Sequence, residues 1–319
     1  MPSSVFSIAK RGRRQLIRGK SAYTVAPPLF ILTCMRSYSS LVCGMLGQHP
    51  QLYGLLEVNL LAGDTVGGVV KLFRRIRPTS LNGLLRTIAQ LEYGAQTEDT
   101  VNAAWDWLHP RMNWSTRRMF EHIAAAVAPR RLIEKSPLNV MRPVFLQRMY
   151  RYFPQAYYLH LTRHPRPTCR SIQQMVEETD AKKGTRRAEE LDPEGLWRRA
   201  HENILDFERQ LPPGQMMRIR GEDLLSDIDG YLPQIEAWLG IDSTPTTLEA
   251  MKHPECSPYA CMGPSNAPFG SDPNYLKQPH YQPRPIAEAR LDGLLEFRTP
   301  RQEVFSEATR RIAQQLGYR

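Results

Sequence analysis

The sequence lacks any continuous run of about 18 apolar residues, the length that a membrane-spanning helix needs, so no stable membrane insertion is expected. Its first 25 residues contain no acid and carry the lysines and arginines between Lys10 and Lys20. No apolar h-region follows these charges, which argues against a secretory signal. We therefore expect a cytoplasmic protein in which residues 1–25 are a loose basic tail, with contact to an anionic partner as the alternative.

Cysteine is scarce, and the five cysteines form neither an even set nor a Cys-x-x-Cys pair. A disulfide framework is not expected, and a reducing compartment is. Cys256 and Cys261 lie near His253 and His280, but without the pairing of structural zinc sites no metal is predicted. The net charge of +10 suits a polyanionic ligand and suits nucleic acid equally well. Since the chain carries no nucleic-acid recognition motif, nucleic acid is not an expected partner.

Apolar residues make up 41% of the 319 positions, so the chain can build a packed core. Short apolar runs alternate with segments of helical periodicity, which predicts an α/β fold with a parallel sheet. We expect strands at 29–33, 131–133, 156–162 and 216–220. We expect helices at 41–46, 137–152, 167–178, 194–211 and 231–239, with two more in 286–317.

A turn of small hydroxyl residues separates the first expected strand from the first expected helix. It reads Thr-Cys-Met-Arg-Ser-Tyr-Ser-Ser from residue 33 to residue 40. Backbone N–H groups at a helix start bind anions with help from the helix dipole, and an arginine can hold two anion oxygens at once. The turn therefore predicts an anion site, with an ordinary helix cap as the alternative. Its candidate ligands are Arg36, Ser37, Tyr38, Ser39 and Ser40.

This turn is also the first of four segments that resemble motifs of the sulfotransferases that use PAPS (3′-phosphoadenosine-5′-phosphosulfate). Arg-Ser-Tyr-Ser-Ser, followed by Gln-His-Pro at 48–50 and Leu-Glu at 56–57, is similar to the 5′-phosphosulfate loop of the carbohydrate and protein-tyrosine branches. Tyr38 stands where that family usually has glycine. His49 is expected to pack behind the loop.

The other three segments follow in the family's order. Glu-Lys-Ser-Pro at 134–137 resembles the family's Lys-(Ser/Asp)-Pro stretch, and Arg-His-Pro-Arg at 163–166 with Ser171 resembles its 3′-phosphate motif. Arg-Gly-Glu-Asp-Leu at 220–224 is similar to Arg-Tyr-Glu-Asp-Leu, with glycine in place of tyrosine. In the 3′-phosphate motif, His164 stands where the family usually has aspartate.

The resemblance implies a P-loop-NTPase-like three-layer fold with a central parallel sheet of about 4–5 strands flanked by helices. Residues 26–319 would form one domain. Within it, 60–128 would be a helical acceptor-side insertion, and the proline-rich stretch 252–285 a loop that covers the donor. The polar and charged composition of 180–195 predicts a mobile surface loop or lid.

The resemblance also implies an enzyme that moves a sulfuryl group from PAPS to an acceptor hydroxyl by in-line displacement and releases PAP. Arg36 and Lys135 would stabilise the charge that develops, and Glu57 would be the general base. His109 and His122 are the alternative bases. The expected donor ligands are the residues of the turn at 36–40 together with Arg163, Ser171, Gly263 and Asn266.

Three alternatives stay open at this stage. A P-loop kinase would need the sequence GxxxxGK[ST], which does not occur. A non-catalytic PAP- or polyanion-binding module is favoured if Glu57 or Lys135 points away from the pocket, and a nucleic-acid binder has only the charge in its favour. The acceptor is expected to be a small molecule or a carbohydrate. Four aromatic residues of the insertion are expected mainly in the core: Tyr93, Trp105, Trp107 and Trp114.

Overall fold

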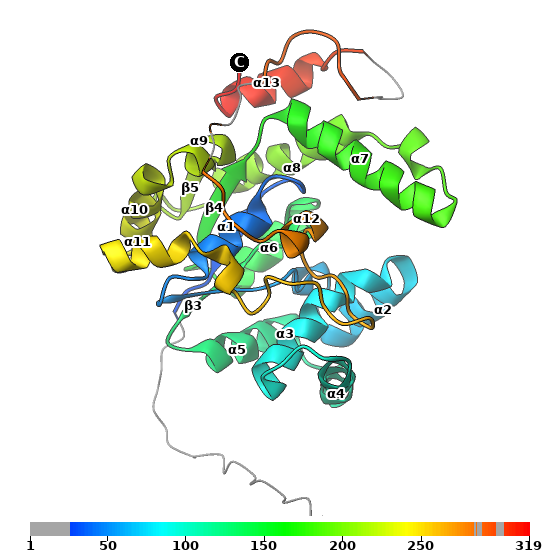
Figure 1. The fold of residues 1–319 in the computed structure, drawn as a ribbon, viewed down its shortest axis with the longest axis vertical. Helices are drawn as coiled ribbons and strands as arrows, with labels where there is room; N and C mark the ends of the chain where they lie inside the picture. Colours follow the sequence, from blue (N-terminus) through cyan, green and yellow to red (C-terminus); the bar gives the residue numbers. More distant parts are fainter. Residues whose placement is uncertain (1–25, 284, 286–288, 298–302) are drawn as a thin grey trace, which may run out of the picture.

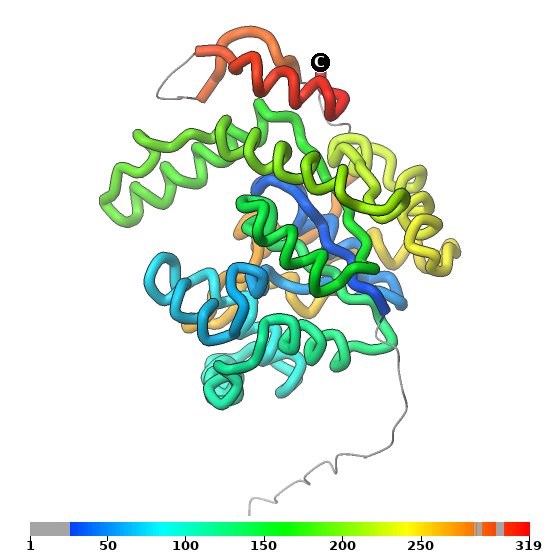
Figure 2. The backbone as a smooth tube through the Cα atoms, turned by 180° about the vertical axis from the view of Figure 1, so that it is seen from behind, coloured from blue at the N-terminus to red at the C-terminus, as the bar shows by residue number. Residues whose placement is uncertain are grey.

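The computed structural model describes residues 26–283, 285, 289–297 and 303–319, and the expected basic tail at 1–25 lies outside this part. A single sheet of parallel strands forms the centre, with helices on both faces (Figures 1 and 2). The strands follow the order β2-β3-β1-β4-β5 across the sheet. Their bounds are β1 Leu29–Leu32, β2 Leu52–Gly54, β3 Arg131–Glu134, β4 Tyr157–Thr162 and β5 Met216–Arg220.

The register of β1 shows why this strand is central and entirely buried. Leu29 lies opposite Ile133 of β3 on one side and Tyr157 of β4 on the other. Because side chains alternate across a strand, Leu29 and Ile31 pack into one apolar core, whereas Phe30 and Leu32 pack into the other. A continuous apolar run is what a parallel strand covered on both faces requires.

The first core lies under the helices that follow β1 and β5. These are α1 Ser39–Leu46, α9 Gly221–Ser226, α10 Ile228–Leu239 and α11 Pro245–Met251. The second core lies on the opposite face and is larger. It is covered by α5 Thr116–Val127, α6 Pro143–Tyr152, α7 Pro165–Lys183, α8 Pro193–Glu208 and α13 Glu307–Gln315.

The segment 60–128 is helical, as the sequence predicts. It contains α2 Val66–Ile76, α3 Asn82–Tyr93 and α4 Glu98–Leu108 in addition to α5, and it forms the lower part of the molecule in Figure 1. Its tryptophans are partly buried against the core, and the Arg111 guanidinium lies 3.8 Å from the ring centre of Trp107. These contacts give the three tryptophans a packing role, whereas Tyr93, expected with them in the core, is exposed. Among the described residues, no helix is long and apolar enough to cross a membrane.

Several expected element bounds were wrong, and each error has a local cause. The helix expected at 137–152 is a 3-10 turn, Pro137–Val140, followed by α6, because Pro143 starts a new helix at its first position. Residues 180–183 of the expected lid are the last turn of α7, which ends only where Gly184 adopts a φ of 64°. In the C-terminal region, the described residues contain one helix, α13, where two were expected.

The strand β2 was not predicted. It has three residues, Leu-Tyr-Gly, and pairs only with β3 at the edge of the sheet. Three residues are too few to show an alternating pattern. The strand nevertheless matters, because it brings the residues that follow it to the side of the sheet at which the carboxyl ends of all the strands lie.

Candidate functional site

The candidate residues gather at one edge of the sheet. Arg36 follows β1, Glu57 follows β2, Lys135 follows β3, and Arg163 follows β4. Since the strands are parallel, their carboxyl ends share an edge, which is where open α/β sheets bind ligands. The motifs that lie far apart in the sequence are therefore brought together by the topology.

The turn after β1 has a backbone conformation that residues other than glycine seldom adopt. Arg36 and Tyr38 have φ values of 66° and 65°, in the left-handed region. Tyr38 is the residue before α1, and its carbonyl accepts the hydrogen bond of Val42 N at 3.0 Å. The N–H groups of the first turn, at Ser39, Ser40 and Leu41, thus have no acceptor within the helix. Such a helix start attracts an anion.

Lys135 lies at the centre of the site, and only 1% of its side chain is exposed. Its ammonium donates to Ser40 Oγ at 2.9 Å, to Glu57 Oε1 at 2.8 Å and to Ser271 Oγ at 2.8 Å. A buried ammonium must be paired and hydrogen-bonded to offset its desolvation, and these contacts supply both. Glu57, with 28% of its side chain exposed, is the part of this cluster that solvent still reaches.

Glu134, the last residue of β3, shapes the turn that carries Lys135. Its carboxylate accepts hydrogen bonds from Ser136 N at 3.0 Å, from Ser136 Oγ, and from Asn139 Nδ2 at 2.5 Å. Complete burial raises the pKa of the Glu134 carboxyl to about 7, although its hydrogen bonds oppose this shift. The Glu134 carboxyl thus has a structural role, because its hydrogen bonds hold the turn in shape.

Arg36 joins three segments of the chain. Its Nε donates to Ser171 Oγ at 2.9 Å, and its Nη1 forms an ion pair with Asp272 Oδ1. Ser171 lies on α7, which directly follows β4. The turn at 36–40 and the Arg163–Ser171 motif therefore form one cluster of cations and hydroxyls.

Arg163 supports the same turn from the other side. Its Nη1 donates to the carbonyl of Arg36 at 2.5 Å, and its guanidinium lies 4.4 Å from the ring centre of Tyr38. The indole of Trp197 on α8 holds the carbonyl of Arg163 through a hydrogen bond of 2.9 Å. Cation–π stacking and a carbonyl contact fix the guanidinium in a partly buried position.

Among the described residues, three buried polar atoms of these motifs have no hydrogen-bond partner: Ser37 Oγ, Arg163 Nε and His164 Nε2. Buried donors without partners are rare in folded proteins. Ser37 Oγ and Arg163 Nε belong to the segments that resemble phosphate motifs, and a bound phosphate oxygen would accept a hydrogen bond from each. The residues present therefore fit a phosphate group.

The late loop meets this cluster through residues that the sequence did not single out. Ser271 Oγ donates to Ser40 Oγ at 2.9 Å in addition to its contact with Lys135, and Asp272 pairs with Arg36. The sequence feature that could have indicated this position is Asp272-Pro273. It is a capping residue followed by proline, the usual start of a helix, and here it begins α12, Pro273–Lys277.

Gly263 and Asn266, the expected donor ligands of this loop, lie elsewhere. Gly263 packs on Arg86, so that a Cβ atom there would lie 2.8 Å from Arg86 Cδ. Asn266 Nδ2 donates to Glu98 O and to Asn102 Oδ1 of α4, both at 3.0 Å. These two residues attach the loop to the helical segment and do not join the cluster around Lys135.

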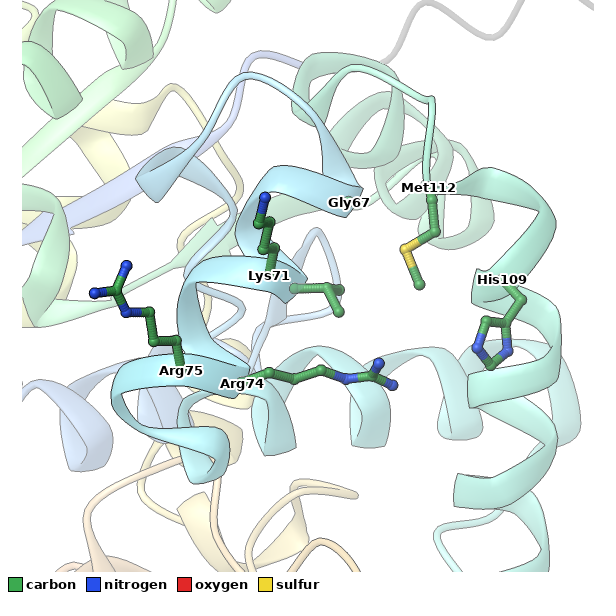
Figure 3. Close-up of a pocket in the computed structure, with 7 residues that line it drawn as sticks. Gly67, Lys71, Arg74, Arg75, His109 and Met112 are labelled. Carbon is green, nitrogen blue, oxygen red and sulfur yellow. The ribbon is translucent and has the colours of Figure 1, made fainter.

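The alternative bases contact other parts of the molecule. His122 Nε2 pairs with Glu92 at 2.7 Å and its ring packs on Trp107. His109 borders a surface hollow of about 560 Å³ between α2 and the end of α4, together with Lys71 and Arg74 (Figure 3). A second, smaller hollow lies where the strands of the sheet begin. Neither hollow is lined by a residue of the cluster around Lys135. His49 is 1% exposed and bonds to Asp242 O at 2.9 Å, in the packing role expected of it.

Comparison with known proteins places this arrangement in a family. A model described as "Sulfotransferase family" matches residues 27–245. The chain belongs to the sulfotransferase family. No curated protein sequence matches it. Among the described residues, no group of three or more histidine, cysteine, aspartate or glutamate side chains is arranged to hold a metal ion.

Solved structures agree with the fold of this sulfotransferase. The sulfotransferase domain from the curacin biosynthetic pathway is 26% identical, with a TM-score of 0.73 over 92% of this chain and 98% of that domain. The sulfotransferase domain of the Synechococcus PCC 7002 olefin synthase is 24% identical, with a TM-score of 0.70 over 92% of this chain and 95% of that domain. The expected α/β fold with a parallel sheet and flanking helices is confirmed.

Proposed function

We propose that this sulfotransferase takes its sulfuryl group from PAPS, passes it to an acceptor hydroxyl and releases PAP. The observation that carries this proposal is the position of Lys135. It is a buried ammonium that touches both the anion-binding start of α1, through Ser40, and a partly exposed carboxylate, Glu57. A cation between an anion site and a candidate base is what sulfuryl transfer to a hydroxyl needs.

The donor supplies an activated sulfuryl group on a phosphate leaving group. We assign its 5′ end to the turn at 36–40 and its 3′-phosphate to Arg163 and Ser171. In an in-line displacement through a loose transition state, the protein's main work is to position the reactants and to stabilise charge on the leaving oxygen. Lys135 and Arg36 perform the electrostatic part.

Glu57 takes the proton of the acceptor hydroxyl. One of its carboxylate oxygens holds Lys135 at 2.8 Å, and the side chain remains partly exposed. The hydroxyl oxygen bonds to sulfur, the bond between sulfur and the phosphate oxygen breaks, and the proton goes to the Glu57 carboxylate. A base in this position raises the nucleophilicity of the hydroxyl by general base catalysis.

The helical segment borders the acceptor side of the site. Gly83 of α3 packs directly on Glu57, and a Cβ atom on Gly83 would come within 2.1 Å of Glu57 O. We therefore propose that segment 60–128 shapes the pocket for a small-molecule or carbohydrate acceptor. The similar domain from the curacin pathway acts in a biosynthetic route, which favours a hydroxyl of a biosynthetic intermediate. We place the enzyme in the cytoplasm.

Titration calorimetry with PAP tests this function. Wild-type protein is expected to bind PAP, and Arg163→Ala is expected to weaken binding at least tenfold, because charge-assisted contacts to phosphate are strong. Arg117→Ala is the matched control, since Arg117 pairs only with Glu121 on the exposed face of α5 among its described contacts. Absence of PAP binding by folded wild-type protein would overturn the proposal.

A further inference from the structure

The late loop places a carboxylate directly on a cation of the donor site. Asp272 pairs with Arg36, the residue that also donates to Ser171. The exposed fraction of the two paired side chains is 12% for Arg36 and 25% for Asp272. The pair is thus largely shielded from water, where charges interact more strongly than at an open surface.

Neighbouring contacts fix Asp272 in this position. Its backbone N–H donates to Ser40 Oγ at 3.3 Å, and its Oδ1 accepts from Asn274 N at 2.9 Å as the cap of α12. Ser271, the residue before it, bonds to Lys135. The loop therefore presents a hydroxyl to one cation of the site and a carboxylate to the other.

A phosphate that binds Arg36 encounters this carboxylate as a charge of the same sign. The turn at 36–40 contains no acid, and Glu57 faces Lys135 rather than Arg36. Asp272 is the acid paired with Arg36 within the described part of the chain. Either the ion pair opens when a phosphate arrives, or the phosphate binds beside a negative charge. Both routes lower the affinity for the nucleotide.

We propose that Asp272 is a specificity-determining residue of the donor site, which holds Arg36 in place of an anion and thereby weakens nucleotide binding. The inference rests on the proposed function, because the competing anion is taken to be a phosphate of PAP. Asp272 keeps Arg36 oriented while the site is free of nucleotide. It also sets the strength with which PAP, the product, is retained.

The substitution Asp272→Asn removes the negative charge of this side chain while keeping its role as a helix cap. Asparagine caps helices about as well as aspartate, so α12 keeps its cap while Arg36 loses its counter-charge. We expect Asp272→Asn to bind PAP about three- to tenfold more tightly than wild type, the range of a partly exposed ion pair. The gain should be smaller for adenosine 3′-monophosphate, because it lacks the 5′-phosphate that the turn of Arg36 is proposed to bind.

Calorimetric titrations of both nucleotides into wild type, Asp272→Asn and Asp106→Asn decide the matter. Asp106 is exposed on α4, so its substitution changes the net charge equally at a remote place and is expected to leave both affinities unchanged. Thermal melting of each variant checks that it is folded.

Each outcome has a defined meaning. Weaker PAP binding by Asp272→Asn would show that the carboxylate only orients Arg36, and would overturn the inference. So would an unchanged affinity, or an equal gain for both nucleotides. Wild-type protein that binds no PAP would overturn the proposed function and this inference together, whereas tight wild-type binding without a gain in the variant would overturn the inference alone.

Discussion

The ring of Tyr38 fills the space that a side chain at position 221 would need. A Cβ atom on Gly221 would lie 2.7 Å from Tyr38 Cδ2 and 3.1 Å from the carbonyl of Thr162. These are the two positions at which the chain departs from the family's pattern in opposite directions, with tyrosine for glycine at 38 and glycine for tyrosine at 221. We infer that the two departures compensate, with the aromatic ring supplied by the turn instead of by the start of α9.

The first prediction follows from this contact. Gly221→Ala is expected to lower the free energy of unfolding by about 1–3 kcal/mol through overpacking against the ring. In Tyr38→Gly the same alanine should cost much less, because the ring is gone and glycine accepts the left-handed backbone. Urea unfolding of the four proteins of this double-mutant cycle measures the coupling. Effects that add to within about 0.5 kcal/mol would contradict the compensation.

The second prediction concerns the anchor of the late loop. Arg86 of α3 is fully buried, and it donates to Gln96 Oε1 at 2.7 Å and to the carbonyls of Phe269 and Cys261 at 2.9 Å each. Arg86→Met leaves the partly buried carbonyl contacts of Phe269 and Cys261 without their donor, so we expect a loss of about 1–3 kcal/mol in the free energy of unfolding.

Arg86→Lys tests the geometry of this anchor. A lysine keeps the charge but cannot bond to separate carbonyls in the planar fork of a guanidinium, so it is expected to restore only a small part of the stability. Arg118→Met, which removes an exposed arginine on α5, is the control in denaturant titrations. Full recovery in Arg86→Lys would show that only the charge matters.

The third prediction separates catalysis from binding at Glu57. Glu57→Gln keeps the shape of the side chain but cannot accept the acceptor's proton, so kcat is expected to fall by about 10²–10⁴-fold. The PAP dissociation constant should not rise, because removing a carboxylate beside Lys135 does not weaken anion binding. Steady-state rates with PAPS together with calorimetry measure both, and Glu121→Gln on the exposed face of α5 is the control. A rate within tenfold of wild type would assign the base elsewhere.

The fourth prediction is acid lability from two buried histidines. His160 Nδ1 accepts from Arg218 Nε at 3.1 Å, so its Nε2 carries the proton that bonds to His201 Nδ1 at 2.9 Å. Burial and the Arg218 charge lower the pKa of His201 to about 3, and burial lowers the pKa of His160 well below its ordinary value. Both rings are therefore neutral in the folded protein.

The sign of the pH effect follows from these shifts. In the unfolded chain both histidines bind protons below about pH 6.5, while the folded protein binds none there until the pH approaches the lowered values. The unfolded state thus binds more protons between about pH 6.5 and 4. In this range the free energy of unfolding decreases as the pH is lowered, by up to about 2.7 kcal/mol per pH unit. In His201→Leu we expect a less stable protein with a shallower slope in denaturant titrations. Parallel slopes for the two proteins would contradict this.

The sequence was most informative where one local pattern determined the structure. Apolar runs located β1, β3, β4 and β5, and the residues next to their carboxyl ends, such as Arg36 and Lys135, were found because a parallel sheet gathers them. Helix ends were less well predicted. The His164 side chain, which accepts from Arg166 N, caps α7 so that the helix starts at Pro165, two residues before the expected start. The assignment of donor and catalytic roles to these residues stays a prediction.

The contacts of the late loop could not be predicted in the same way. Ser271 and Asp272 reach the site because Arg86 holds the loop through backbone carbonyls and because Gly270, with a φ of 124°, packs on Gly83. Hydrogen bonds to carbonyls leave no periodic pattern in the sequence. The composition of the same loop points to Gly263 and Asn266, but composition does not distinguish the residues that attach the loop from those that enter the site.

The wide sequence separation of the contacting groups governs when a newly made chain can assemble the cluster around Arg36 and Lys135. Arg36 and Asp272 are 236 residues apart, and Lys135 and Ser271 are 136 apart. Contacts of such long range form late, since the intervening chain must first be ordered. During synthesis, which proceeds from the N-terminus, the phosphate turn and the sheet exist before Ser271 and Asp272 have been added. The growing polypeptide therefore cannot complete the contacts of Arg36 and Lys135 with the late loop until residues 271 and 272 have emerged from the ribosome.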